Sequence, residues 1–364
     1  MKKVFLLPVI AVVITVLLFT GCSRQTSGTT RVDVFWYTYA DTYLASVRNS
    51  MIAQAADLPQ LNITHHDSRE DQALQTQMIQ TAITQGTKLL IVNIATTGSQ
   101  DAAMNVVGMA RNANIPIIFF NREVSDAVIQ SYANAVFVGT DADEAGYMQG
   151  QAIAEYLLQP GNRERYDLNG DGIIRYIMFR GEHGNAEAFG RTKYSIQEAN
   201  RLLEGSGLVL APSVANETST QYENDGISNF FLYGNWSAAA AANLMRTALT
   251  AHSLTTGAIE LIIANNDDQA LGAIEAMNEA GFNTGRADAG YIPVFGVDAT
   301  PVAQEAIRAG RMTGTIMQDA EGMARTILEL LQNVVAGEHV FANSSRYNVD
   351  AGVNKIRVPY SIFD

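Results

Sequence analysis

The chain has 364 residues, of which 47% are hydrophobic, and it carries a formal net charge of −13 at pH 7. This length and apolar content suffice for two ordinary domains with hydrophobic cores, and they exclude an intrinsically disordered chain. The negative charge argues against a nucleic-acid-binding protein, because such proteins need a positive surface to displace the counterions of phosphates. A small neutral or cationic ligand fits this charge better.

The N-terminal 22 residues, MKKVFLLPVIAVVITVLLFTGC, combine two lysines, an apolar run from Val4 to Phe19 and small residues before Cys22. This layout predicts an export signal. A membrane-spanning anchor is the alternative, since the run is only slightly shorter than the roughly 20 apolar residues of a spanning helix. Cys22 is the only cysteine in the chain, so it forms no internal disulfide.

The segment FTGC resembles a bacterial lipobox, which implies cleavage before Cys22 and lipidation of its thiol. Phe19 stands where the usual pattern has Leu. The polar residues 23–30, SRQTSGTT, are predicted to form a flexible tether between the membrane and the folded part.

From Arg31 onward, apolar runs alternate with segments that have apolar residues at helical spacing. A first series of runs is VDVFWY, LNITHH, LLIVNI, IPIIFF and AVFVGT, and a second is IRYIMFRG, IELIIANND, IPVFGVD and GTIMQDA. Continuous apolar runs are typical of parallel strands buried on both faces. Their alternation with helices predicts two α/β lobes built from βαβ units. The polar residues 211–236 are predicted to be an extended surface loop.

Polar residues follow several of these predicted strands at the same position. They are Tyr37, Asn93, Asn121, Asn266 and Asp298. Asn and Asp are ordinary turn residues at strand ends, but open α/β sheets also place their ligand crevices there. Five such residues across two lobes favour a shared cleft.

The segment DLNGDGIIR, Asp167–Arg175, spaces oxygen-bearing side chains as an EF-hand calcium loop does. Asp167, Asn169 and Asp171 occupy positions 1, 3 and 5 of such a loop, and Ile173 the position that ligates through its backbone carbonyl. The twelfth position, which needs a bidentate carboxylate, is Met178, and the segment IRYIMFRG resembles a strand rather than a helix. The segment is therefore not an EF-hand sensor.

Six motifs in one order resemble the periplasmic glucose/galactose-binding proteins of methylgalactoside-type ABC transporters. They are FFNREVSDAV, VGTDADEAGYMQGQAIAEY, DLNGDGIIRYIMFRGEHGNAEAFGRT, IELIIANNDDQALGAIEAM, IPVFGVDATP and IRVPY. The resemblance runs from about Arg31 to the C-terminus and implies two Rossmann-like lobes joined by a three-stranded hinge, with one hexose in the cleft. The expected N-terminal lobe is 31–139 plus 318–349, and the expected C-terminal lobe is 140–317 plus 350–364.

The resemblance also implies a set of ligand-binding residues. Tyr43 and Trp236 would stack on the two faces of the sugar, whose C–H groups suit an aromatic surface. The implied polar contacts around its edge are Tyr37, Asp41, Asn93, Asn185, Glu187, Arg191, Asn266, Asp298 and Gln318. Three of them differ from the family, which has His at 185, Asp at 187 and Asn at 318, and this leaves the choice between glucose and galactose open.

In the family, a distant residue that matches Glu260 supplies the missing carboxylate of the calcium loop. Arg175 stands where the family has a Gln that ligates calcium, and a guanidinium offers no lone pair. Either calcium binds with water in that place, or Arg175 pairs with Glu260 and the loop is held without metal. The expectation is a structural calcium ion bound by Asp167, Asn169, Asp171, Ile173 and Glu260.

The sequence thus predicts a lipid-anchored periplasmic protein that captures D-glucose or D-galactose for an ABC transporter. The implied partners are the permease, its ATPase and a chemotaxis receptor.

A sugar-processing enzyme is the alternative function, because Asp41, Glu187 and Asp298 could supply paired carboxylates for glycoside cleavage. The sequence lacks the GxSxG and GxxxxGK[ST] motifs of other enzyme classes. A sugar-responsive repressor would need a basic helix-turn-helix where this chain has the signal segment. A binding protein for another monosaccharide, such as a pentose, is the remaining alternative.

Overall fold

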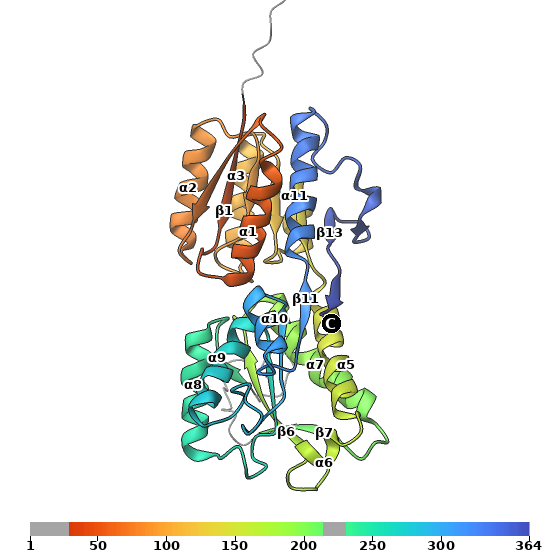
Figure 1. Ribbon diagram of the computed structural model, residues 1–364. Coiled ribbons are helices and arrows are strands. Elements are labelled where there is room, and N and C mark those ends of the chain that lie inside the picture. Colours follow the sequence, from red (N-terminus) through yellow and green to blue (C-terminus); the bar gives the residue numbers. More distant parts are fainter. Residues whose placement is uncertain (1–28, 214–230, 364) are drawn as a thin grey trace, which may run out of the picture.

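The computed structural model describes residues 29–213 and 231–363, which form two α/β lobes stacked one above the other (Figure 1). Each lobe is a mainly parallel sheet with helices on both faces. This architecture confirms the predicted fold class, two Rossmann-like lobes joined by a hinge.

The first lobe has a seven-stranded sheet in the order β12-β13-β5-β4-β3-β1-β2. All neighbours are parallel except β12 and β13. Its strands are β1 (Thr30–Trp36), β2 (Leu61–Asp67), β3 (Leu90–Val92), β4 (Ile117–Phe120), β5 (Ala135–Gly139), β12 (Asn348–Val349) and β13 (Lys355–Arg357). Its helices are α1 (Thr42–Ala55), α2 (Gln72–Thr84), α3 (Gln100–Asn112), α4 (Asp126–Gln130) and α11 (Ala320–Val335), with a 3-10 turn η2 (Ser344–Arg346).

The second lobe has a sheet in the order β14-β11-β10-β9-β6-β7, and β8 also pairs with β6. All neighbours are parallel except β14 and β11. Its strands are β6 (Ile173–Arg180), β7 (Val209–Pro212), β8 (Leu232–Tyr233), β9 (Leu261–Ala264), β10 (Val294–Asp298), β11 (Gly314–Gln318) and β14 (Tyr360–Ile362). Its helices are α5 (Ala142–Leu157), α6 (Asn162–Tyr166), α7 (Ala186–Leu203), α8 (Ala238–Ala251), α9 (Asp267–Glu279) and α10 (Pro301–Arg308).

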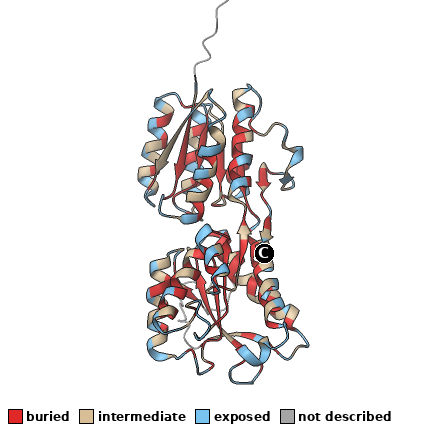
Figure 2. Cartoon of the chain, in the orientation of Figure 1, coloured by how far each residue is buried: buried red, intermediate tan, exposed pale blue. Residues whose placement is uncertain are grey.

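The predicted apolar runs are the buried strands of the two sheets. β4, β5 and β9 are buried along their whole length. Helices remove both faces of these strands from water, which is why the sequence shows continuous rather than alternating apolar residues. Figure 2 shows buried central strands and helices whose outer faces are exposed.

The chain passes between the lobes at three places: between β5 and α5, between β11 and α11, and between β13 and β14. The last crossing follows Arg357, because β13 pairs with β5 of the first sheet. The expected domain boundary at residue 350 places β13 in the second lobe. The pairing of β13 with β5 shows that this strand belongs to the first lobe. A strand of three residues carries too little pattern for the sequence to reveal its partner.

In the part of the chain that the structure describes, no helix is both long and apolar enough to cross a membrane. The predicted signal segment with Cys22 and most of the predicted tether lie outside the described residues. Residues 214–230 of the predicted surface loop also lie outside them.

Candidate ligand-binding site

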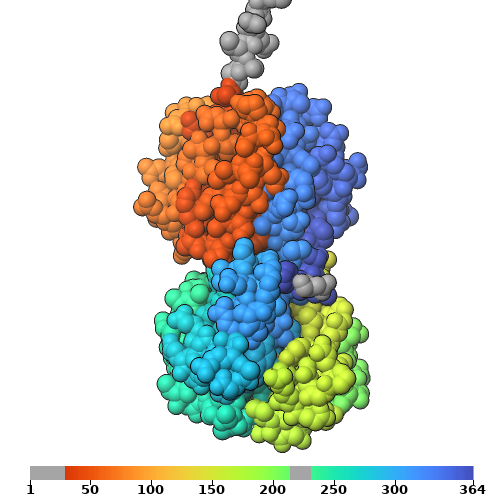
Figure 3. Space-filling model, viewed as in Figure 1, coloured from red at the N-terminus to blue at the C-terminus, as the bar shows by residue number. Residues whose placement is uncertain are grey.

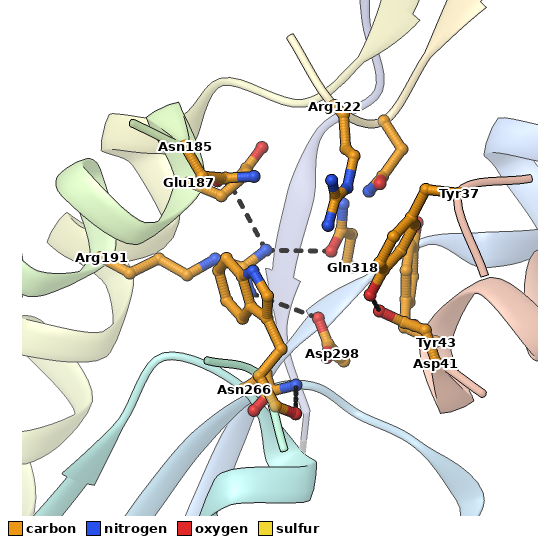
Figure 4. A pocket seen from close by; sticks show the side chains of 12 residues that line it. Tyr37, Asp41, Tyr43, Arg122, Asn185, Glu187, Arg191, Asn266, Asp298 and Gln318 are labelled. Atoms are coloured by element: carbon orange, nitrogen blue, oxygen red, sulfur yellow. Dashed lines mark hydrogen bonds and ion pairs between the residues drawn. The ribbon is translucent and has the colours of Figure 1, made fainter. Parts of the chain in front are cut away.

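The two lobes enclose a cavity at the carboxyl ends of strands from both sheets (Figure 4). Its volume is about 390 Å³, which includes space open to solvent. All predicted ligand residues except Asn93 line it, together with Asn121 and Arg122. In the space-filling view the two lobes are in contact (Figure 3). Of the five polar residues that follow predicted strands, all except Asn93 line this one cavity, as expected.

Three residues that line the cavity are also helix N-caps. The side chains of Asp41, Asn185 and Asn266 accept a hydrogen bond from a backbone N–H in the first turn of α1, α7 and α9, respectively. Asp and Asn are favoured there because their side-chain oxygen satisfies an amide that has no partner within the helix. The same hydrogen bond holds each side chain at the edge of the cleft.

Trp236 lies between β8 and α8 with a φ of 64°, a left-handed conformation that is rare for a bulky residue. Two neighbouring residues hold this conformation. The Asn266 Nδ2 donates to the Trp236 carbonyl at 3.2 Å. Gly181 packs directly against the indole, since a Cβ atom at this glycine would lie 2.3 Å from the indole Cζ2. Backbone strain that the surroundings impose is common at functional sites. The indole is thereby fixed in the cavity wall.

Two tyrosines line the cavity from the first lobe. The Tyr37 hydroxyl donates to Asp41 at 2.9 Å, and Figure 4 shows these two side chains next to each other. The Tyr43 hydroxyl, which needs a partner, is 3.7 Å from the Met323 sulfur. Tyr43 and Trp236 come from different lobes, as two walls of a cleft require, and their stacking on one ring stays a prediction.

Arg191 is the charged centre of the cavity (Figure 4). Its Nη1 donates to the Asn265 carbonyl at 2.7 Å and lies 3.4 Å from the Asp298 carboxylate, and its Nη2 donates to Gln318 at 3.0 Å. Its Nε is buried and has no hydrogen-bond partner among the described residues. A buried donor without a partner costs about 1–3 kcal/mol.

Asn93 is the one expected ligand residue that is not part of the cavity lining, so its contact with the sugar stays a prediction. It is fully buried, accepts from the Tyr37 amide at 3.2 Å and donates to the Asn121 side chain at 3.1 Å. Asn121 lines the cavity in its place, with a φ of 60°. Both residues follow a strand, so the sequence did not distinguish the side chain in the cleft from the one beneath it.

Arg122 also lines the cavity, although the sequence did not predict it as a ligand-binding residue. Its guanidinium lies 3.4 Å from the centre of the Tyr37 ring. It also forms an ion pair of 2.7 Å with Glu182, which follows β6 in the other lobe. One feature of the sequence could have indicated this role: Arg122 directly follows Asn121 in FFNREVSDAV, a motif that resembles the family.

Further contacts join the facing edges of the lobes, so the structure is the closed arrangement. The Thr42 hydroxyl donates to Asp268 at 2.9 Å, and the Asn185 amide donates to the Thr97 hydroxyl at 3.4 Å. Gly98 packs on the Gly184 backbone so closely that a Cβ atom at Gly98 would lie 2.7 Å from the Gly184 carbonyl oxygen.

The predicted calcium loop is closed by Arg175. Its Nη2 lies 2.7 Å from Asp171, its Nη1 donates to the Ile173 carbonyl at 3.1 Å, and Nη1 lies 3.8 Å from Glu260. Each of these three partners was an expected calcium ligand. Among the described residues, no cluster of three or more His, Cys, Asp or Glu side chains is arranged to hold a metal. This donor set, with a guanidinium inside it, does not fit a calcium ion.

The comparisons with known proteins agree with this geometry. Residues 32–339 match the family described as periplasmic binding protein domain. The chain is 30% identical over 361 residues to the D-galactose/methyl-galactoside binding periplasmic protein MglB of Haemophilus influenzae, covering 99% of this chain and 96% of the relative. It is 27% identical over 295 residues to the ribose import binding protein RbsB of Salmonella typhimurium, covering 81% and 80% of the two chains.

A solved structure has the same fold. It is an ABC transporter solute binding protein from Bacillus halodurans with bound myo-inositol, which superposes with a TM-score of 0.65 at 23% identity and covers 93% of this chain and 96% of its own. The family match spans most of the chain and confirms the resemblance that the motifs indicated. The chain belongs to the family of periplasmic binding proteins.

Proposed function

We propose that this chain captures D-glucose or D-galactose between its lobes and delivers it to the permease and ATPase of an ABC transporter. The chain is a sugar-binding component of such a transporter and not an enzyme, since the relatives that it matches along most of its length are sugar-binding transport proteins. The hexose assignment is supported by the relative named for D-galactose, which aligns with almost the whole chain.

The observation that carries the proposal is the combination of groups in one enclosed cleft. An indole, at Trp236, lines the same cavity as the planar polar groups of Arg191, Asp298 and Asn266. Planar groups can each engage two neighbouring hydroxyls, and the apolar C–H face of a pyranose suits an aromatic ring.

The lining of the cavity supports a ligand that contacts both lobes. Lining residues come from both lobes. Because a bound sugar contacts both lobes only when they meet, it stabilises the closed state over the open one.

Closure has a predicted pH dependence through Asp268. Burial raises the pKa of Asp268 to about 6, and the nearby Asp41 carboxylate adds to the rise, whereas an exposed Asp has a pKa of about 3.9. Opening the lobes would expose Asp268, so closure takes up a proton between these pKa values. The free energy of closure is therefore most favourable below about pH 4 and becomes less favourable as the pH rises through about 6.

We expect the dissociation constant for the sugar to be about tenfold lower at pH 5 than at pH 7.5, which corresponds to about one pKa unit of linkage. Asp268→Asn should remove most of this difference, whereas Asp288→Asn, at an exposed position of the same lobe, should preserve it. The measurement is a titration of Trp236 fluorescence at both pH values. An Asp268→Asn protein with the full wild-type difference would contradict the assignment to this residue.

Isothermal titration of residues 23–364 against D-glucose, D-galactose, D-ribose and L-arabinose tests the proposed function. The described elements of the fold begin at Thr30, so this protein keeps both lobes. Heat with glucose or galactose supports the hexose assignment. A response to a pentose alone would favour the second candidate, a binding protein like the ribose-binding relative, and no heat with either hexose would overturn the proposal.

We also propose that the protein is held at the membrane, facing the periplasm, by lipid on Cys22. The supports are the family membership and the FTGC segment with the only cysteine of the chain. Mass spectrometry of the mature N-terminus should find a lipid-modified cysteine, and Cys22→Ser should release the protein from membranes. An N-terminus that still carries residues 1–21 would contradict this proposal. A chemotaxis receptor as a further partner stays a prediction.

For the expected calcium site, we propose that the Arg175 guanidinium takes the place of the ion. The wild-type midpoint of thermal unfolding, Tm, should then be the same with calcium and with a calcium chelator. Arg175→Gln removes the guanidinium and adds a carbonyl ligand, so calcium should raise the Tm of that variant. At a concentration 100 times the Kd, binding adds about 2.7 kcal/mol of stability.

The matched control for this prediction is Arg201→Gln, which removes an exposed arginine paired with Glu198 on α7. Its Tm should not respond to calcium. A wild-type protein that calcium stabilises would show that the ion binds despite Arg175.

A further inference from the structure

We propose that Thr140, Glu187 and Tyr360 are positioning residues, which hold Arg191 toward the ligand and couple sugar binding to the angle between the lobes. The inference rests on the proposed sugar-binding function and adds a role for residues at the hinge. Thr140 and Tyr360 belong neither to the predicted ligand set nor to the lining of the cavity.

Each of the three crossings between the lobes contributes one side chain to a common network. Thr140 directly follows β5, Gln318 ends β11 just before the second crossing, and Tyr360 begins β14 just after the third. Hinge motion is absorbed by backbone rotations in such connecting residues. Side chains at these positions therefore shift relative to α7 when the lobes open.

All three side chains meet the same pair on α7, Glu187 and Arg191. The Thr140 hydroxyl donates to one carboxylate oxygen of Glu187 at 2.6 Å, and the Tyr360 hydroxyl donates to the other at 2.7 Å. The Arg191 Nη2 donates to the side-chain Oε1 of Gln318 at 3.0 Å and to the Tyr360 hydroxyl at 2.9 Å. Glu187 and Arg191 are themselves joined at 3.2 Å.

The network is shielded from water, which strengthens its electrostatic contacts. None of its five members is more than 6% exposed. Hydrogen bonds in such surroundings reinforce one another, and loss of one partner leaves a buried polar group unsatisfied. Both carboxylate oxygens of Glu187 have hinge partners, so Glu187 acts on the ligand mainly through Arg191. Opening the hinge would disturb the same contacts that aim the guanidinium.

The test compares two substitutions at Thr140 and one at Tyr360. Thr140→Val removes the hydroxyl at similar volume, and Thr140→Ser keeps it. Tyr360→Phe removes the other hydroxyl bond to Glu187. Tyr156→Phe is the matched control, because its hydroxyl is bonded to Tyr166 within the second lobe and away from the hinge.

The measurements are the affinity and dissociation rate for D-galactose and D-glucose, followed by Trp236 fluorescence, and the radius of gyration of the sugar-free protein in solution. We expect Thr140→Val and Tyr360→Phe to weaken binding about tenfold, mainly through faster dissociation, and to increase the radius of gyration. Thr140→Ser and Tyr156→Phe should stay close to the wild type in both readouts.

Wild-type dissociation rates and wild-type dimensions in Thr140→Val and Tyr360→Phe would overturn the inference, as would an equal effect of Tyr156→Phe. A purely structural role would lower the Tm without changing the dimensions of the folded, sugar-free protein. If the wild type binds neither hexose, the proposed function fails, but the radius of gyration of the sugar-free variants still tests the coupling to the hinge.

Discussion

Arg191→Met is expected to weaken sugar binding by about 100-fold or more, since hydrogen bonds from a charged group contribute about 1.5–3 kcal/mol each and 1.4 kcal/mol is tenfold in affinity. The substitution removes the guanidinium from the centre of the cavity. It also leaves the carboxylates of Glu187 and Asp298, at 3.2 and 3.4 Å from Arg191, without their buried counter-charge. Breaking a buried ion pair by removing one partner typically costs about 3–5 kcal/mol of folding stability.

The pH dependence of folding stability distinguishes loss of the buried counter-charge from loss of packing. Burial already raises the pKa of Asp298, and Arg191 opposes that rise. Without the arginine, the folded-state pKa should rise further, so the variant should recover stability as the pH falls toward the unfolded value of about 3.9. Urea unfolding at pH 7.5 and pH 5 would measure this recovery. A stability deficit that is equal at both pH values would contradict the account.

The matched control for Arg191→Met is Arg201→Met, on the same helix. Arg201 is 63% exposed and pairs with Glu198 at 2.6 Å on the surface of the protein. Exposed ion pairs contribute about 0–1 kcal/mol. Arg201→Met should therefore leave binding unchanged and stability nearly so, which assigns the large effects at Arg191 to burial and position rather than to loss of charge.

Trp236→Ala is expected to weaken sugar binding by about 30-fold or more. Truncation of an aromatic residue that dominates an interface typically costs about 2 kcal/mol or more of binding free energy. Trp236 is only partly buried, so the fold should lose little stability. Trp36→Phe is the reciprocal control, because Trp36 is fully buried in the core of the first lobe. It should lower stability but keep the affinity and the ligand-induced change in fluorescence.

Gly181→Ala tests the same wall without removing the indole. The added methyl group would lie 2.3 Å from the Trp236 ring, so the ring must shift, and we expect an affinity between those of the wild type and Trp236→Ala. Isothermal titration with the hexose that binds the wild type measures all three proteins. Wild-type affinity in both Trp236→Ala and Gly181→Ala would show that the indole is not a sugar-binding wall.

The amino-acid sequence determined the fold class and most of the cleft. Strands covered on both faces require continuous apolar runs, such as β4 and β9, so their positions could be predicted from local composition. Asp41 and Asn266 combine a helix cap with a place at the cleft, and caps have a local sequence signature. Resemblance to the family then supplied Trp236, which no periodic pattern would have indicated.

Only the tertiary structure decided which of these side chains meet and what supports them. Asn93 and Asn121 both follow strands, but one lies under the cleft and the other in it, because the direction of a side chain at a strand end depends on backbone angles that the sequence does not show. Thr140 and Tyr360 are separated by 220 positions in the chain, yet their hydroxyl oxygens lie 3.0 Å apart. Contacts of this kind arise when three crossings converge at a hinge, and no local pattern encodes that convergence.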